Sequence, residues 1–285
     1  MKRFIWLFVL LFTFVGECKT KEPIYFVTMM KSGTHLLEKY LKLLLSTTDD
    51  QYEKINSSLE KRYIGKGFGD KSLFLKFSHV STPGKNRLKV PDRLKMILLF
   101  RDPRDVLISA IHFIPTMPKG LKGVKNGPFI HQWSKYTTEE RITSLLTEKC
   151  LDQNLEKFLN KNFLKKEIFP PSMTNFLTQG YRAIELFERP NTLVIRFEDL
   201  VGQQGGGCSQ AQYQAMEEIA LFIGKEFNEE VYEKISKDLF GATKTFRKGK
   251  IGSWKQELSE ENKKLFKEYY GDLVINMGYE EDNYW

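Results

Sequence analysis

The feature that most constrains the fold is a strand, loop and helix pattern near the amino terminus. Residues 24–27 read Ile-Tyr-Phe-Val, an apolar run typical of a buried strand. Lys-Ser-Gly-Thr-His follows at 31–35, and the apolar residues of 36–44 recur at helical spacing. Such a loop points several backbone N–H groups and the positive end of the helix dipole at one spot. We therefore expect it to bind a phosphate-like or sulfate-like group.

This loop differs from the phosphate-binding loop of nucleoside triphosphatases, whose pattern G-x-x-x-x-G-K-[ST] requires glycine directly before the lysine. Here Met30 precedes Lys31. Residues 30–36 instead resemble P-K-S-G-T-T-W, the 5'-phosphosulfate-binding loop of sulfotransferases that use 3'-phosphoadenosine 5'-phosphosulfate (PAPS). Leu36 stands where that family has tryptophan.

A second motif starts where another apolar run, 96–100, ends. The residues that follow, Arg-Asp-Pro-Arg-Asp-Val-Leu-Ile-Ser at 101–109, match the family motif R-[ND]-P-[KR]-D-x-x-x-S. Asp102 suits a helix N-cap and Pro103 the first helical position, so a helix is predicted there. The resemblance implies that Arg101 and Ser109 hold the 3'-phosphate of the nucleotide. A salt bridge between Arg101 and Asp105 is the alternative interpretation of the arginine.

The third motif, Arg-Lys-Gly-Lys-Ile-Gly-Ser-Trp-Lys at 247–255, is similar to the family's R-K-G-x-x-G-x-W-K. A run of basic residues often forms only a solvated surface. Three separate segments that agree in order on one ligand are more specific, and they indicate a member of the PAPS-dependent sulfotransferase family. The resemblance implies a donor site that contains the residues Lys31, Ser32, Gly33, Thr34, His35, Arg101, Ser109, Phe197, Arg247, Lys248 and Gly249.

The predicted catalytic residues are His79 and Lys31. Residues 73–79 look like a strand that ends in histidine, and the family places its general base in K-T-H after such a strand. A histidine can take the proton from an acceptor hydroxyl as the oxygen attacks sulfur. A structural role for His79 is the alternative. Phe77 stands where the family has its second lysine, so that role is not carried onto Lys76.

Two aromatic residues are candidates for the adenine site. The segment 192–200 looks like a further buried strand that ends in the family's [YF]-E-D-[LM]. Phe197 in this segment either rests against adenine or belongs to the core. Phe246 could supply the stacking that Leu36 cannot.

Alternating strands and helices predict an α/β fold: one domain at 19–285 with a central parallel sheet flanked by helices and a P-loop-like phosphosulfate-binding loop. Residues 114–178 are rich in proline and glycine and then polar, and we expect them to form an acceptor-binding lid. Its aromatic residues, among them Phe129, Trp133 and Tyr136, are either acceptor contacts or packing residues. The reaction scheme needs no metal, and the sequence has no clustered ligand set for one.

The first 18 residues have the layout of a signal peptide, with Lys2 and Arg3 before an apolar run. That run is short for a bilayer span, so the predicted location is the secretory pathway or export, with the cytoplasm as the alternative and membrane contact only through an uncleaved segment. The net charge of +8 suits an anionic nucleotide, and no motif for specific nucleic-acid binding accompanies it.

The expected function is therefore transfer of a sulfuryl group from PAPS to a hydroxyl or amine on a small-molecule, glycan or peptide acceptor. Two alternatives stay open. One is a P-loop-like small-molecule kinase, which the methionine before Lys31 disfavours. The other is a nucleotide- or glycan-binding protein that kept the fold without turnover, which the presence of both His79 and Lys31 disfavours. The acceptor and the oligomeric state are not predicted.

Overall fold

The computed structural model describes residues 24–46, 52–55, 73–79, 92–113, 136–147, 175–242 and 246–285 of the 285-residue chain. At 52–55 and 73–79 the description is that of the backbone. The predicted signal peptide and most of the predicted lid lie outside these ranges, so both stay predictions.

The described residues form a five-stranded parallel sheet. In chain order the strands are β1 (Ile24–Thr28), β2 (Tyr52–Ile55), β3 (Leu73–His79), β4 (Met96–Phe100) and β5 (Thr192–Arg196). Their order across the sheet is β2-β3-β1-β4-β5, and each neighbouring pair is parallel. The predicted central parallel sheet is confirmed.

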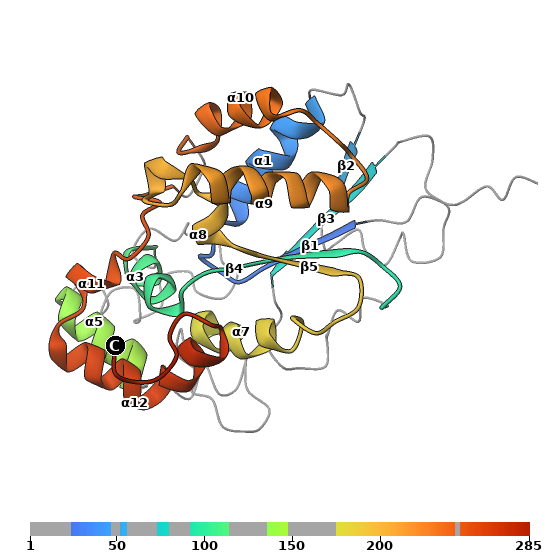
Figure 1. Cartoon of the computed structure of the whole chain (residues 1–285). Helices are drawn as coiled ribbons and strands as arrows, with labels where there is room; N and C mark the ends of the chain where they lie inside the picture. The colour runs from blue at the N-terminus through green and yellow to red at the C-terminus, as the bar shows by residue number, and fades with distance from the viewer. Residues whose placement is uncertain are drawn as a thin grey trace, which may run out of the picture.

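Helices cover both faces of this sheet (Figure 1). One face carries α1 (Thr34–Ser46), α9 (Ser209–Phe222) and α10 (Glu229–Leu239). The other carries α3 (Pro103–Phe113), α5 (Thr138–Thr147), α7 (Asn175–Ile184) and α12 (Glu260–Asn276). Short helical turns occur at α8 (Phe197–Leu200), η3 (Gln203–Gly205) and α11 (Trp254–Glu257).

Two of the inner strands, β1 and β4, have apolar sequences without alternation. Phe26 of β1 packs in the core under α1 and α9, whereas its neighbours Tyr25 and Val27 pack in the core against α3 and α12. Every residue of β1 and β4 is buried. Because helices cover both faces, each side chain of a central strand meets apolar neighbours.

The segment 192–200 departs from its prediction as one buried strand. The strand β5 ends at Arg196, and 197–200 form the helical turn α8. Within β5 only Ile195 is fully buried, since β5 is an edge strand of the described sheet. The other edge strand, β2, was not predicted because its sequence, Tyr-Glu-Lys-Ile, is half polar.

The described part of the predicted lid packs as core. Helix α5 buries Ile142, Leu145 and Leu146 in the cluster that also contains residues of α3 and α12. Tyr136, a candidate acceptor contact, is partly buried against the same cluster. Within the described ranges no helix has the length and apolarity needed to cross a bilayer.

Candidate active site

The carboxyl ends of three strands bring the predicted site together. Thr28 at the end of β1 pairs with His79 at the end of β3 and with Leu99 in β4. Parallel strands end at one edge of their sheet, which is where open α/β sheets bind ligands. The loop after β1, the backbone of His79 and Arg101 after β4 therefore share this edge. The His79 side chain lies outside the description, so its role as base stays a prediction.

The loop after β1 is shaped by a buried serine and a glycine. The hydroxyl of Ser32 donates to the carbonyl of Met29 at 2.6 Å and lies 3.2 Å from that of Leu99. Gly33 has φ +96°, and a Cβ there would lie 2.6 Å from the ring of Phe197. The loop therefore needs glycine at this position. Ser32 ties the loop to β4 rather than offering its hydroxyl to the site.

Lys31 stands at the centre of the loop in the left-handed region, with φ +67°. Its ammonium nitrogen lies 3.7 Å from the ring centroid of Phe113 in α3. Burial, and then the positive charges of Arg101 and Arg247, lower the pKa of Lys31 from 10.5 to about 8. A neighbouring anion would reverse this shift, since it favours the charged form.

Arg101, in the second motif, contacts residues of the first and third motifs. Its Nη2 donates to the carbonyl of Lys250 at 2.7 Å, and its Nη1 lies 3.5 Å from the carbonyl of Lys31. The guanidinium lies 4.3 Å from the ring centroid of Phe197. The ion pair with Asp105, our alternative interpretation, is also present at 3.4 Å. Nε is buried and has no hydrogen-bond partner among the described residues.

Asp105 attaches the third motif to α3. Its Oδ2 accepts the N–H of Gly252 at 2.8 Å, and its Oδ1 accepts that of Trp254 at 3.1 Å. Burial raises the pKa of Asp105, while Arg101 and the two N–H groups oppose that shift. A buried carboxylate that accepts hydrogen bonds from two motifs fixes their relative position.

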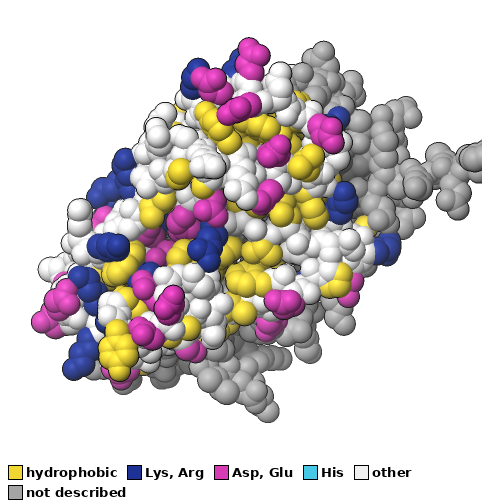
Figure 2. All heavy atoms as spheres, viewed as in Figure 1, with side chains coloured by type: hydrophobic (Ala, Val, Ile, Leu, Met, Phe, Trp, Pro, Cys, Tyr) yellow, Lys and Arg dark blue, Asp and Glu magenta, His cyan; other side chains and the backbone are white. Residues whose placement is uncertain are grey.

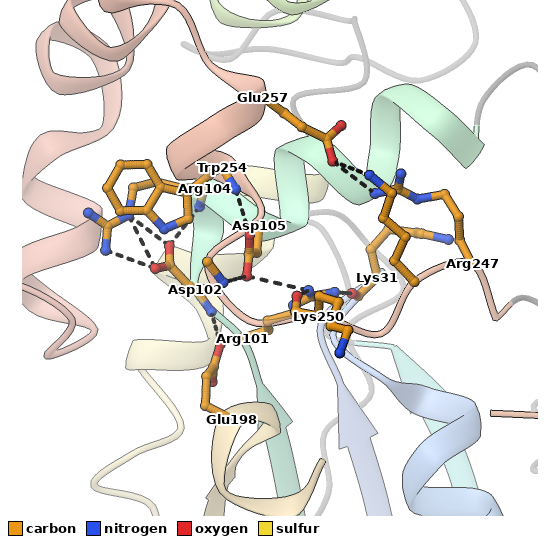
Figure 3. A network of polar contacts seen from close by, with 12 residues as sticks. Lys31, Arg101, Asp102, Arg104, Asp105, Glu198, Arg247, Lys250, Trp254 and Glu257 are labelled. Atoms are coloured by element: carbon orange, nitrogen blue, oxygen red, sulfur yellow. Dashed lines mark hydrogen bonds and ion pairs between the residues drawn. The ribbon is translucent and has the colours of Figure 1, made fainter. Parts of the chain in front are cut away.

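A second layer of contacts holds the start of α3 (Figure 3). Asp102 accepts the N–H of Arg104 at 2.9 Å, which confirms the predicted N-cap, and binds the Arg104 side chain at 2.8 Å. The Arg104 guanidinium lies 3.9 Å from the ring centroid of Trp254 and 4.4 Å from that of Trp285. The N–H of Asp102 donates to Glu198 at 3.0 Å. The contacts of Arg104 with Trp254 and Trp285, and of Asp102 with Glu198, were not predicted, because they join segments far apart in the chain.

One pocket takes its walls from all three motifs. Its lining includes every predicted donor-site residue except Ser32, namely Lys31, Gly33, Thr34, His35, Arg101, Ser109, Phe197, Arg247, Lys248 and Gly249. Along α3 the lining residues Asp105, Ile108 and Ser109 follow helical spacing. Phe197 belongs both to this wall and to the core, so the two interpretations of that residue coexist.

An apolar corner adjoins the charged part of the pocket. Leu36, Phe240 and Phe246 line it, and the rings of Phe240 and Phe246 meet edge to face with centroids 5.1 Å apart. Phe246 remains 40% exposed. Gly249 has φ +59°, and a Cβ there would lie 2.7 Å from the Phe246 ring. Phe240 was not predicted, since no motif residue marks it.

The pocket concentrates positive charge. Among its described lining residues, Asp105 is the one carboxylate, and the cations are Lys31, Arg101, Arg247, Lys248 and Lys250. On the face in Figure 2, by contrast, basic and acidic side chains are interspersed. In the ranges that the structure describes, no three His, Cys, Asp or Glu residues are placed to hold a metal ion. A small concave site with so many cations suits a ligand with more than one anionic group.

Known proteins share both the sequence pattern and the architecture. The mouse sulfotransferase SULT7A1, whose crystal structure is complexed with PAP, has a similar fold with a TM-score of 0.55. The likeness covers 90% of this chain and 87% of that chain at 16% sequence identity. None of the curated proteins matches this sequence. The sulfotransferase domain model matches residues 21–278, which include all three motifs. The chain thus belongs to the sulfotransferase domain family.

Proposed function

We propose that this protein transfers a sulfuryl group from PAPS to a hydroxyl or amine acceptor. The observation that carries the proposal is the convergence of Lys31, Arg101 and the 247–249 segment on one pocket. These three segments each resemble a part of the sulfotransferase nucleotide site. The mouse relative is complexed with PAP, which supports a nucleotide of this kind for the present chain.

The residues of the pocket fit an adenosine nucleotide with phosphates at two positions. Arg101 has a buried Nε without a described partner, and its planar fork suits a phosphate group. Gly33 and Gly249 let the two loops pack directly against the rings of Phe197 and Phe246, which a Cβ at either position would meet. The corner formed by Leu36, Phe240 and Phe246 offers an apolar surface to a base. In our assignment Arg101, Ser109 and Arg247 hold the 3'-phosphate.

The chemistry requires positioning and charge stabilisation more than covalent participation. As the acceptor oxygen bonds to sulfur, the bond from sulfur to the 5'-phosphate oxygen breaks. Lys31 stabilises the charge that grows on that leaving oxygen, while His79 takes the proton from the acceptor. The products are a sulfate ester, or a sulfamate from an amine, and 3',5'-bisphosphoadenosine.

Calorimetry with 3',5'-bisphosphoadenosine tests the nucleotide assignment, and transfer of labelled sulfate from PAPS tests turnover. We expect binding without magnesium and labelled product with at least one acceptor class. Preference for ATP with magnesium would instead favour a kinase. Nucleotide binding without transfer to phenol, alcohol, amine, sugar or tyrosyl acceptors would indicate a binding protein on this fold.

We further propose that the reaction takes place in the secretory pathway or after export, because 1–18 resemble a signal peptide. A compartment outside the cytosol would need a supply of the donor. Fractionation together with amino-terminal sequencing of the mature protein tests this, since an intact Met1 in the cytosol would contradict it.

A further inference from the structure

Glu257 is a carboxylate beside the pocket that the proposed chemistry does not use. Its Oε1 lies 3.1 Å from the ammonium nitrogen of Lys248 and 3.7 Å from Nη2 of Arg247. Its Oε2 lies 2.6 Å from Nε2 of His112 in α3. Figure 3 shows the carboxylate directed at Arg247, on the side away from Arg101. Glu257 thus pairs with two exposed cations of the pocket, Arg247 and Lys248.

The basic loop at 246–254 does not need these ion pairs to keep its backbone in place. Asp105 accepts the N–H groups of Gly252 and Trp254, and Arg101 donates to the carbonyl of Lys250. On the other side of the loop, the N–H of Ile251 donates to the carbonyl of Gly205 at 2.9 Å. What Glu257 adds is therefore charge rather than backbone position.

The cations of the pocket stabilise the ionised form of Glu257. Burial opposes its charged form, but hydrogen bonds to His112 and Lys248 and the charge of Arg247 leave the pKa of Glu257 below the usual range. Without a bound anion the lining cations repel one another: after burial, the charges of Arg101 and Arg247 contribute to the lowered pKa of Lys31. A carboxylate next to Arg247 and Lys248 relieves this repulsion.

We propose that Glu257 competes with the 3'-phosphate of the nucleotide for Arg247 and Lys248, and thereby limits nucleotide affinity. The inference rests on the proposed function, because that function places the phosphate at Arg247, and the adjacent Lys248 lines the same pocket. Each phosphate contact with Lys248 replaces or shares its contact with Glu257. Weaker competition should therefore raise the affinity for nucleotide. It should also slow the dissociation of 3',5'-bisphosphoadenosine after transfer, since most affinity differences lie in the dissociation rate.

Calorimetry of the full chain with 3',5'-bisphosphoadenosine tests the proposal through Glu257→Gln. The amide keeps a hydrogen-bonding group for His112 and removes the charge. We expect the variant to bind 3',5'-bisphosphoadenosine about threefold tighter or more, because the ion pairs of Glu257 with Arg247 and Lys248 are only partly exposed to solvent. Loss of a structural support would weaken binding instead, so a gain in affinity separates competition from support. Equal or weaker binding by Glu257→Gln would overturn the proposal.

Glu233→Gln is the matched control. It makes the same change of charge in α10, where Glu233 pairs with Lys237 at 2.9 Å and both side chains are exposed. We expect no change in nucleotide affinity, and a gain equal to that of Glu257→Gln would attribute both to net charge and overturn the proposal. If the wild-type chain releases no heat with 3',5'-bisphosphoadenosine, the proposed function itself fails, which is a distinct result.

A double-mutant cycle identifies the partner. In the Arg247→Met and Lys248→Met background, Glu257→Gln should change nucleotide affinity much less than in the wild type. An undiminished gain would mean that Glu257 acts on another group and would overturn the assignment. Thermal unfolding without nucleotide reports whether each variant is folded.

Discussion

The loop after β1 and the basic loop at 246–254 face the same pocket, yet they are held in different ways. Ser32 and Gly33 shape the first loop through contacts with Met29, in the loop itself, and with Leu99 and Phe197. The second loop makes its main contacts with Asp105 and Gly205, which belong to other parts of the chain. The first loop is held against β4 and Phe197, whereas the second depends on α3 through Asp105.

The two loops therefore differ in what we expect them to contribute to the site. The first loop carries Lys31, which is deep in the pocket and tied to the chemistry that we propose. The second carries Arg247 and Lys248, whose side chains are 35% and 56% exposed. Changes in the first loop should affect turnover most, and changes in α3 should release the second loop while the first stays in place.

The largest effect is expected from Lys31→Ala. Removal of the cation that we assign to the leaving oxygen should lower sulfate transfer by about two to three orders of magnitude. The fold should persist, because the Ser32 contacts remain. Labelled-sulfate transfer and thermal unfolding measure both effects. Near-wild-type turnover in the variant would refute the role of Lys31.

Asp105→Ala should come second and should separate the two loops. The change removes the carboxylate that accepts hydrogen bonds from Arg101, Gly252 and Trp254. We expect it to lower the free energy of unfolding by about 3 kcal/mol. Urea denaturation measures this loss. Hydrogen exchange should accelerate at Gly252 and Trp254 and stay slow at Leu37, whose N–H donates to Gly33. Equal acceleration in both loops would show that they form one cooperative unit.

Gly33→Ala makes the converse change in the first loop. A methyl group at φ +96° meets Phe197, so we expect a loss of about 2 kcal/mol and weaker nucleotide binding. The matched control is Gly206→Ala, which has φ +92° with no atom within 4 Å of the added Cβ. The control should lose about half as much stability or less. Equal losses would mean that backbone strain, not the Phe197 contact, determines the result.

The pH dependence of nucleotide binding should be smaller and should follow Lys31. With a pKa of about 8, Lys31 loses its charge as the pH rises above that value, and its attraction for phosphate falls. Affinity at ~pH 9 should be at most about tenfold lower than at ~pH 7. Calorimetry in buffers of different ionisation enthalpy should detect proton uptake on binding near the pKa. Uptake that persists in Lys31→Met would assign it to another group.

Lys248→Ala should have the smallest effect. Its ammonium is exposed and already shared with Glu257, so we expect nucleotide affinity to fall about threefold or less. Calorimetry at two salt concentrations measures this change. A loss well above threefold would show that the basic loop holds the ligand more tightly than its exposure indicates.

The same contrast explains how much could be predicted from the sequence. Strands β1, β3 and β4 and the start of α3 follow from apolar runs and from Pro103, because these signals are local. The three motifs predicted the pocket lining, with Ser32 as the residue that is instead buried below the loop. The turn at Phe197 and the edge strand β2 were not predicted, since neither has a strong apolar periodicity.

The contacts that assemble the site could not be predicted in this way. Gly252 lies 147 positions after Asp105, and no period within either segment shows that one binds the other. Phe240 and Glu257 adjoin the pocket through tertiary packing alone. Motif resemblance can assign residues to a common ligand. The groups that hold those residues or compete for them can be identified only from the three-dimensional structure.

The lining residues of the pocket come from the segments 30–36, 101–113, 197–201, 240–241 and 246–253, so the pocket exists only when distant parts of the chain are folded together. A partly folded or clipped molecule would lack at least one wall. Any nucleotide that binds here stabilises the whole domain by mass action, by about 2.7 kcal/mol at a hundredfold excess over Kd. Stoichiometry in a nucleotide titration would consequently report the native fraction of a purified sample, which makes it a folding assay before any acceptor is known.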